Sequence, residues 1–249
     1  MVIALLGTPV GVGAAVAQAP QPPASASLPS DTELDALLTA RNWNAISAAI
    51  SAAKAPDSLM QAMNWLSTRL KAGGGSLLGF LYAPRLWGFG SGLQIENPTK
   101  DARVTAGLIV LYTYQLIVID GAKCADRTAP GNRLSQLLTQ NREVLEYLRS
   151  KPNGLKARVI VLAMDFENRT APLRKDDDLL CRGGMEEMQA GIAAGTARDL
   201  TGKTNHPGRT IGVEARPVWT PRMLAPATYQ PIQERARAEM EARLLKLVQ

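Results

Sequence analysis

A single long apolar stretch does most to limit what this chain can fold into. Residues 102–119 carry one charged side chain, that of Arg103, and the uncharged part, 104–119, includes two threonines and one glutamine. These 16 uncharged residues are fewer than the roughly 20 that a helix needs to cross a bilayer. We therefore expect this segment to form the central helix of the core.

Helix start and stop signals surround this apolar segment. Residues 30–33 (Ser-Asp-Thr-Glu) have the form of a capping box, Asn42 is a favourable N-cap, and the glycines at 73–75 end a third amphipathic stretch. Apolar residues recur at helical spacing over 134–148, 155–168, 184–197 and 231–248. Short helices with Pro or Gly connections predict a mainly α, irregular bundle of antiparallel helical hairpins.

One segment near the C-terminus breaks this helical pattern. Residues 201–231 contain five prolines, four basic residues and one acid, together with several apolar residues. A proline-rich segment cannot stay helical for long, and its apolar side chains argue against a free tail. We expect it to run extended across the helical body before a C-terminal helix, and we expect 30–249 to form one domain.

The N-terminal residues have the features of an export leader. Residues 1–17 are apolar and uncharged and end in Ala-Val-Ala, the small-x-small pattern of a signal-peptidase site, although the usual basic residue before the apolar run is missing. The Pro- and Ala-rich residues 18–29 follow as a disordered tether would. We expect removal of 1–17, a periplasmic location, and no transmembrane span in the mature chain.

The two cysteines are predicted to pair. Thiols of exported proteins tend to form disulfides, and the chain has only Cys124 and Cys181. Closing a loop of that length contributes roughly 4 kcal/mol in the chain-entropy model. The alternative is two separately buried thiols.

The charge is unevenly distributed along the chain. Residues 1–120 carry 7 basic and 7 acidic side chains, whereas 121–249 carry 21 and 15, so the whole net charge of +6 lies in the second half. In an exported protein a basic half favours acidic envelope polymers or anionic lipid headgroups over nucleic acid as partners. The alternative is a charge that serves solubility alone.

The residue types present exclude most catalytic classes. His206 is the only histidine, so Ser-His, Cys-His and multi-histidine metal sites lack their usual residues, and we expect no metal or cofactor. Catalysis by carboxylates alone, as in glycosidic cleavage, stays open. The acids nearest apolar stretches are Glu96, Asp120, Asp165 and Glu167.

The least ordinary stretch is glycine-rich and aromatic. Within 73–92, four of the chain's twelve aromatic residues lie among seven glycines, namely Phe80, Tyr82, Trp87 and Phe89. Aromatic rings beside glycines can form a surface on which a sugar, peptide or partner protein stacks. The alternative is that they fill the core between helices.

Together these features favour a non-catalytic exported protein that binds or scaffolds a cell-envelope partner, either a protein or a polymer. Two alternatives stay open. One is a carboxylate-dependent hydrolase of cell-wall glycan, which requires two acids in a cleft. The other is a small-ligand carrier, which requires an apolar pocket.

Overall fold

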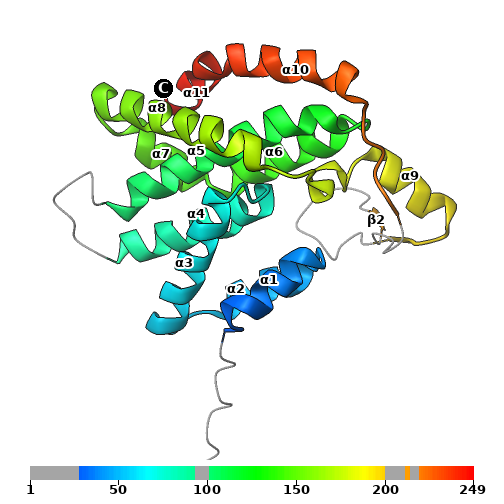
Figure 1. Ribbon diagram of the computed structural model, residues 1–249, viewed down its shortest axis with the longest axis horizontal. Coiled ribbons are helices and arrows are strands. Elements are labelled where there is room, and N and C mark those ends of the chain that lie inside the picture. The colour runs from blue at the N-terminus through cyan, green and yellow to red at the C-terminus, as the bar shows by residue number, and fades with distance from the viewer. Residues whose placement is uncertain (1–27, 93–100, 200–210, 214–218) are drawn as a thin grey trace, which may run out of the picture.

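Helix α5 (Ala102–Asp120) is the central element of the fold (Figure 1). The computed structural model describes residues 28–92, 101–199, 211–213 and 219–249. Within α5, twelve of 19 residues are buried, including every residue from 109 to 117. A helix that is buried on all sides must be apolar on all sides, which explains the composition of this stretch.

The described part of the chain contains ten further helices, most of which pack on α5 or on its neighbours, and the predicted mainly α single domain is confirmed. They are α1 (Asp31–Thr39), α2 (Trp43–Ala52), α3 (Pro56–Lys71), α4 (Ser76–Ser91), α6 (Thr128–Gln140), α7 (Arg142–Arg149), α8 (Asn153–Thr170), α9 (Met185–Ala193), α10 (Pro226–Ala238) and α11 (Met240–Val248). Three short 3-10 turns are η2 (Gly121–Lys123), η3 (Ala171–Leu173) and η4 (Asp178–Cys181). Strands β1 (Ala197–Asp199) and β2 (Ile211–Val213) form a small antiparallel pair.

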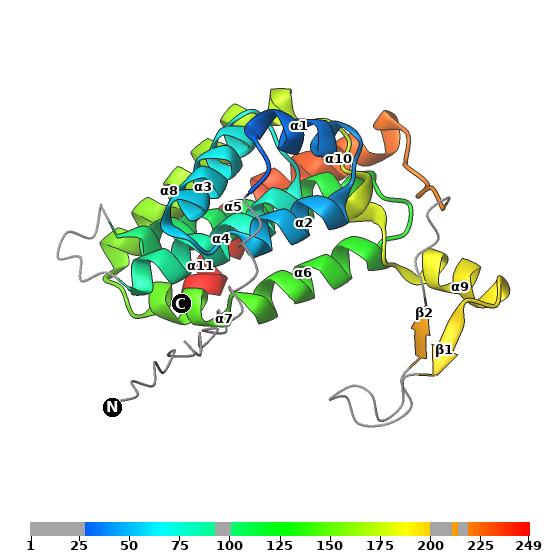
Figure 2. The same cartoon turned by 90° about the horizontal axis from the view of Figure 1, so that it is seen from below.

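The helices form layers around the central one. Helices α4 and α8 pack along α5, α3 covers α4, and α6, α7 and α10 contact other faces of α5. Helices α1 and α2 form a hairpin on α4, while α11 packs on α7 and α8. Figure 2 shows α9 and the β1–β2 pair projecting from one end of this body.

Local capping explains where the first helices begin. The side chains of Ser30 and Glu33 cap each other's backbone N–H groups, so the predicted capping box is present. The Asn42 side chain accepts a hydrogen bond from the N–H of Ala45 at 3.2 Å and begins α2. Pro56 occupies the first turn of α3, where its missing N–H costs nothing.

The structure differs from the sequence prediction in three helices. The one predicted over 184–197 ends at Ala193, before strand β1 begins at Ala197. The stretch predicted over 134–148 is two helices, because Asn141 interrupts it and its side-chain amide donates to the carbonyl of Leu137. The last predicted helix begins earlier, at Pro226 rather than Pro231. Pro226 has the fixed φ that suits a first helical turn, and Pro231 lies within the helix.

Of the extended segment predicted over 201–231, residues 226–231 are helical and belong to α10, whereas 219–225 run outside any helix. Leu224 N–H donates to the carbonyl of Lys123 at 2.7 Å, and Ala125 N–H donates to the carbonyl of Arg222 at 3.0 Å. These bonds hold the chain against the end of α5. The predicted leader 1–17 and His206 lie outside the described residues.

The span 102–123, which joins α5 and η2, is the one helical span in the described residues that is long and apolar enough to cross a membrane. Its mean hydropathy is 1.6, and 67% of its most apolar window is buried inside the protein. Such burial is what the central helix of a helical core shows.

Helix α4 approaches α5 closely at Gly79. A Cβ atom at this position would lie 1.9 Å from Thr113 Oγ1 and 3.0 Å from Thr113 Cβ. The Thr113 side chain is buried, and its hydroxyl donates to the carbonyl of Ile109 at 2.7 Å. The absence of a side chain at Gly79 therefore sets the spacing of these two helices.

We predict opposite effects for the same substitution at two glycines of α4. Gly79→Ala should lower the free energy of unfolding by about 1–3 kcal/mol, because it overpacks a rigid contact. Gly88→Ala should raise it by about 0.5–1 kcal/mol, since alanine favours the helix and no atom lies within 4 Å of its Cβ position. Urea denaturation of the two variants tests this, and an equal shift in both would refute the close approach.

Candidate functional site

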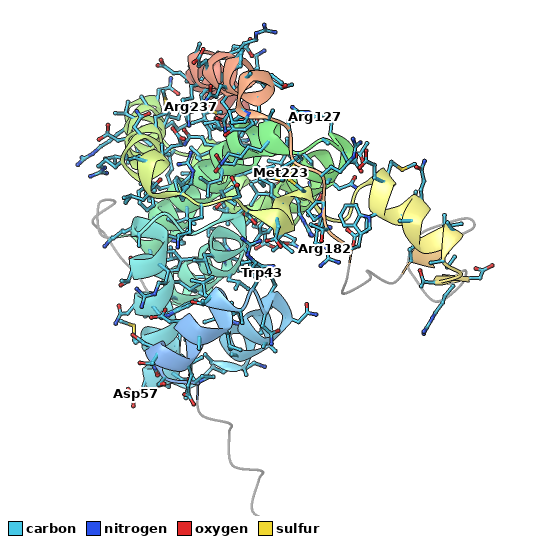
Figure 3. All side chains as sticks on the ribbon, turned by 45° about the vertical axis from the view of Figure 1, so that its right-hand side comes forward. Trp43, Asp57, Arg127, Arg182, Met223 and Arg237 are labelled. Atoms are coloured by element: carbon cyan, nitrogen blue, oxygen red, sulfur yellow. A yellow bond between two sulfur atoms is a disulfide. The ribbon has the colours of Figure 1, made fainter. Side chains whose placement is uncertain are left out.

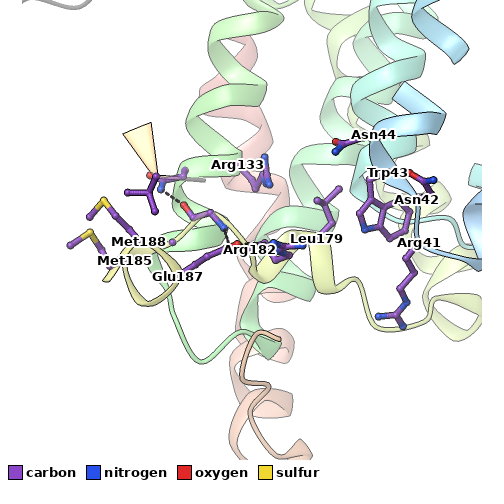
Figure 4. Close-up of a pocket in the computed structure, with 14 residues that line it drawn as sticks. Arg41, Asn42, Trp43, Asn44, Arg133, Leu179, Arg182, Met185, Glu187 and Met188 are labelled. Atoms are coloured by element: carbon purple, nitrogen blue, oxygen red, sulfur yellow. Dashed lines mark hydrogen bonds and ion pairs between the residues drawn. The ribbon is translucent and has the colours of Figure 1, made fainter. Parts of the chain in front are cut away.

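A pocket of about 530 Å³ lies between the α1–α2 hairpin and the segment from η4 to α9 (Figure 4). This volume is within the range of small-molecule sites. The pocket is rich in basic and amide side chains and also contains a tryptophan and one carboxylate, namely Arg41, Arg133, Arg182, Asn42, Asn44, Asn132, Trp43 and Glu187. Four apolar side chains also line it, so the pocket combines cationic and hydrogen-bonding groups with apolar surface from Leu179, Met185, Met188 and Val213.

The turn between α1 and α2 supplies one wall of the pocket. Arg41 has a φ of 53°, a left-handed conformation that is uncommon for residues other than glycine. The turn places Asn42 to cap α2, with Trp43 directly after it. The Arg41 guanidinium lies 3.1 Å from a carboxylate oxygen of Asp178, so an ion pair joins this wall to η4.

The opposite wall is held by the disulfide. Cys124 and Cys181 are bonded to each other and buried, so the predicted pairing is present and neither is a free thiol. The bridge connects the end of α5 to the residue directly before Arg182. Met223 of the C-terminal segment lies over it, with Met223 Sδ 3.4 Å from Cys181 Sγ (Figure 3). The disulfide thus fixes the position of the loop after Cys181, and this loop places Arg182 in the pocket lining.

The carboxylate in the pocket lining is already engaged. Glu187 Oε1 lies 2.7 Å from Arg182 Nη2, and Glu187 Oε2 accepts the Gly183 N–H at 2.7 Å. Gly183 has a φ of +79°, which glycine adopts without strain. Glu187 therefore orients Arg182 and the tight turn beside it.

Arg133 is the least neutralised cation of the pocket. Its Nη1 donates to Gln136 Oε1 at 3.0 Å, whereas its buried Nε has no hydrogen-bond partner, and no ion pair with Arg133 occurs among the described residues. Burial lowers the pKa of Arg133, and Asp177 and Glu187 oppose this shift from a distance. An arginine still stays protonated at neutral pH. A desolvated guanidinium without a contacting anion favours an anionic ligand.

Trp43 was not among the candidate site residues that the sequence indicated. The available signal was local, because Arg41, Asn42 and Asn44 surround it at a helix start. In Figure 3, Trp43 and Arg182 lie near each other on separate elements. Both line the pocket, although they are 139 positions apart in the sequence.

The structure does not bring the four predicted aromatic residues together. They lie on α4, where Phe80 and Trp87 share one face and Tyr82 and Phe89 the opposite one. Trp87 packs edge-on against Tyr147 with ring centroids 5.5 Å apart. Tyr82 hydrogen-bonds Ser67, and burial raises its pKa. None of the four lines the cationic pocket.

The candidate catalytic carboxylates lie elsewhere. Arg174 Nε is 2.7 Å from Asp120 Oδ2 and its Nη2 is 2.5 Å from Glu167 Oε1, and both carboxylates are largely buried. Burial raises the pKa of Asp120, and the charge of Arg174 opposes this shift. Asp165 is exposed, and Glu96 lies outside the described residues. This cluster joins α5, α8 and the segment after η3 by ion pairs.

Comparison with protein-family models, with curated proteins and with solved structures finds no match to this chain. In the described residues no group of three or more His, Cys, Asp or Glu side chains is placed to hold a metal ion. The chemistry of the pocket itself is therefore the guide to function.

We predict that Arg174→Met destabilises the protein in a pH-dependent way. At pH 7 it leaves Asp120 and Glu167 without their shared cation, although Glu167 keeps Arg237, whose Nη2 lies 3.1 Å from Glu167 Oε1, and the loss should cost about 3–5 kcal/mol. Burial raises the pKa of Asp120, and without the opposing charge of Arg174 this pKa rises further. The folded state then binds more protons than the unfolded state, so its stability falls as pH increases. The loss should therefore shrink between pH 7 and pH 4.5 in urea denaturation.

The exposed Arg142 gives the matched control for Arg174. Its side chain is 79% exposed and pairs with Glu146, so Arg142→Met should leave stability nearly unchanged at both pH values. A loss in Arg174→Met that is the same at both pH values would contradict a charge-based role.

We also predict that the disulfide stabilises the whole domain. The double variant Cys124→Ser, Cys181→Ser should lose about 4 kcal/mol of unfolding free energy, because the reduced chain gains entropy when unfolded. Urea titrations with and without reductant give the measurement. Reductant should lower the urea midpoint of the wild type and leave that of the double variant unchanged. If the urea midpoint of the fully reduced wild type equals that of the oxidised wild type, the disulfide does not stabilise the domain.

Proposed function

We propose that this protein is an exported, non-catalytic binding protein that recognises an anionic glycan segment of the cell envelope in the cationic pocket. The observation that carries the proposal is Arg133, a partly buried guanidinium that lines the pocket and has no ion pair among the described residues. A carboxylate or phosphate group of the ligand would pair with the part of this guanidinium that faces the pocket, since arginine binds both groups well.

The other pocket residues suit the remainder of such a ligand. Asn42, Asn44 and Asn132 line the pocket, and amides both donate and accept hydrogen bonds, as the hydroxyls of a sugar require. The Trp43 ring offers an apolar surface with a polar N–H, on which the apolar face of a sugar ring can stack. The combination of guanidinium, amide and indole groups favours an acidic sugar over a purely apolar ligand.

The pocket supports binding rather than hydrolysis. Glycosidic cleavage requires a pair of carboxylates across the scissile bond. Among the described residues that line this pocket, Glu187 is the one carboxylate, and it is bonded to Arg182 and to the Gly183 N–H. Outside it, Asp120 and Glu167 pair with Arg174, and the buried Asp101 pairs with Arg103. No acid pair therefore faces the pocket in this part of the chain.

The export part of the proposal has two supports. One is the leader-like sequence at 1–17, and the other is the disulfide, since such bonds persist in oxidising compartments. In an envelope setting the excess of basic residues in the second half of the chain favours a polyanionic partner. Acidic polymers of the envelope fit this description better than nucleic acid.

Titration calorimetry with a galacturonic acid oligosaccharide tests the proposal. We expect the wild type to bind it, and a sugar-phosphate oligomer of similar charge, more tightly than the neutral galactose oligosaccharide. Arg133→Met should weaken binding by about 10-fold to 100-fold, because a charge-assisted hydrogen bond is lost. The same variant should raise the unfolding free energy by about 1 kcal/mol, since an unpartnered buried donor is removed.

Arg235→Met is the matched control, because it removes the same charge from an exposed position on α10. It should weaken binding little. Equal binding of acidic and neutral oligosaccharides, or equal losses in the two variants, would refute recognition at Arg133. Release of shorter oligosaccharides during incubation would favour the hydrolase instead.

A further inference from the structure

A second cavity lies on a different part of the molecule, between α3, α4, α5 and α8. Its volume is about 480 Å³, again within the range of small-molecule sites. It shares no lining residue with the cationic pocket. We propose that this groove binds the acyl chain of a free long-chain carboxylate, a use that is independent of the proposed glycan site.

The interior of the groove is apolar. Leu70 and Ile109 are buried and contribute to its lining, and three partly exposed side chains, Leu108, Leu162 and Phe166, contribute more of it. The Phe166 ring stacks on Tyr112, with centroids 4.3 Å apart. Such a surface gains free energy when it covers methylene groups.

Charged and hydroxyl side chains also line the groove, and of these Thr170 is buried. Lys71 and Arg169 line it and are exposed, and neither forms an ion pair with another described residue. Arg169 Nε donates to the carbonyl oxygen of Asp165 at 3.2 Å, which leaves its other nitrogens available. An apolar interior with two cations at the rim complements a ligand with one acyl chain and one carboxylate.

Hydroxyl groups also line the groove. Tyr82, Ser67 and Thr105 line the groove, and the Tyr82 hydroxyl bonds to Ser67. Tyr82 therefore belongs to a ligand-sized cavity, although without the other three aromatic residues that the sequence grouped with it. The Leu162 side chain is 39% exposed, and an acyl chain in the groove would cover this apolar surface.

Displacement of a fluorescent fatty acid by saturated carboxylates of 10 to 16 carbons, below their micelle concentrations, tests the proposal on the full mature chain. We expect affinity to rise by about fourfold for each added methylene until the groove is filled. The methyl ester of the best ligand should bind at least tenfold more weakly, because it lacks the charge that Lys71 and Arg169 would contact.

Two pairs of variants locate the site. Leu162→Ser should weaken binding several-fold, whereas Val161→Ser, its exposed neighbour on α8 that does not line the groove, should not. Arg169→Glu should weaken binding at least tenfold, whereas Arg158→Glu, an exposed arginine on the same helix, should not. Circular dichroism and urea midpoints confirm that each variant is folded, and all four substitutions are at exposed positions.

Each other outcome overturns the proposal. Absence of displacement by every carboxylate would show that the groove takes no acyl chain. Equal affinity for the acid and its methyl ester would remove the role of the rim cations. Equal or tighter binding of a lysophospholipid with the same chain would assign the groove to a membrane lipid rather than a free acid. None of these results bears on Arg133, so the glycan proposal is tested separately.

Discussion

The burial of α5 on every side is the constraint on which the rest of the structure depends. A helix without a solvent face requires neighbours all round, and short amphipathic helices supply them. Close approach is allowed where side chains are missing. A Cβ at Gly79 would collide with Thr113, and one at Gly107 would lie 2.5 Å from Leu148. The small residues along these contacts therefore determine how tightly α4 and α7 can pack on the core.

Two different interactions at the C-terminal end of α5 attach the later part of the chain to this core. Asp120 pairs with Arg174 before η4, and Cys124 bonds to Cys181 at the end of η4. Both contacts hold the segment that leads to α9. Because Arg182 directly follows the bridged cysteine, the geometry of the cationic pocket depends on covalent and ionic contacts that are themselves built on α5.

The pocket and the groove are chemically distinct. The pocket at Arg133 contains cations, amides and an indole ring, whereas the groove at Leu162 combines an apolar surface with two cations. Their ligand preferences follow from a guanidinium without an ion pair in the pocket and from exposed apolar surface in the groove. An anionic group suits both, which agrees with the basic character of the second half of the chain.

Features that depend on local pattern or composition could be predicted from the amino-acid sequence. The apolar stretch predicted the core helix, capping residues predicted helix starts at Ser30 and Asn42, and a lone cysteine pair predicted the disulfide. Which side chains meet depends on the packing of the folded chain. It separated the aromatic residues of α4 onto opposite faces, paired Asp120 with Arg174, and placed Trp43 near Arg182. These outcomes depend on packing between segments far apart in the chain, and local periodicity carries no information about such contacts.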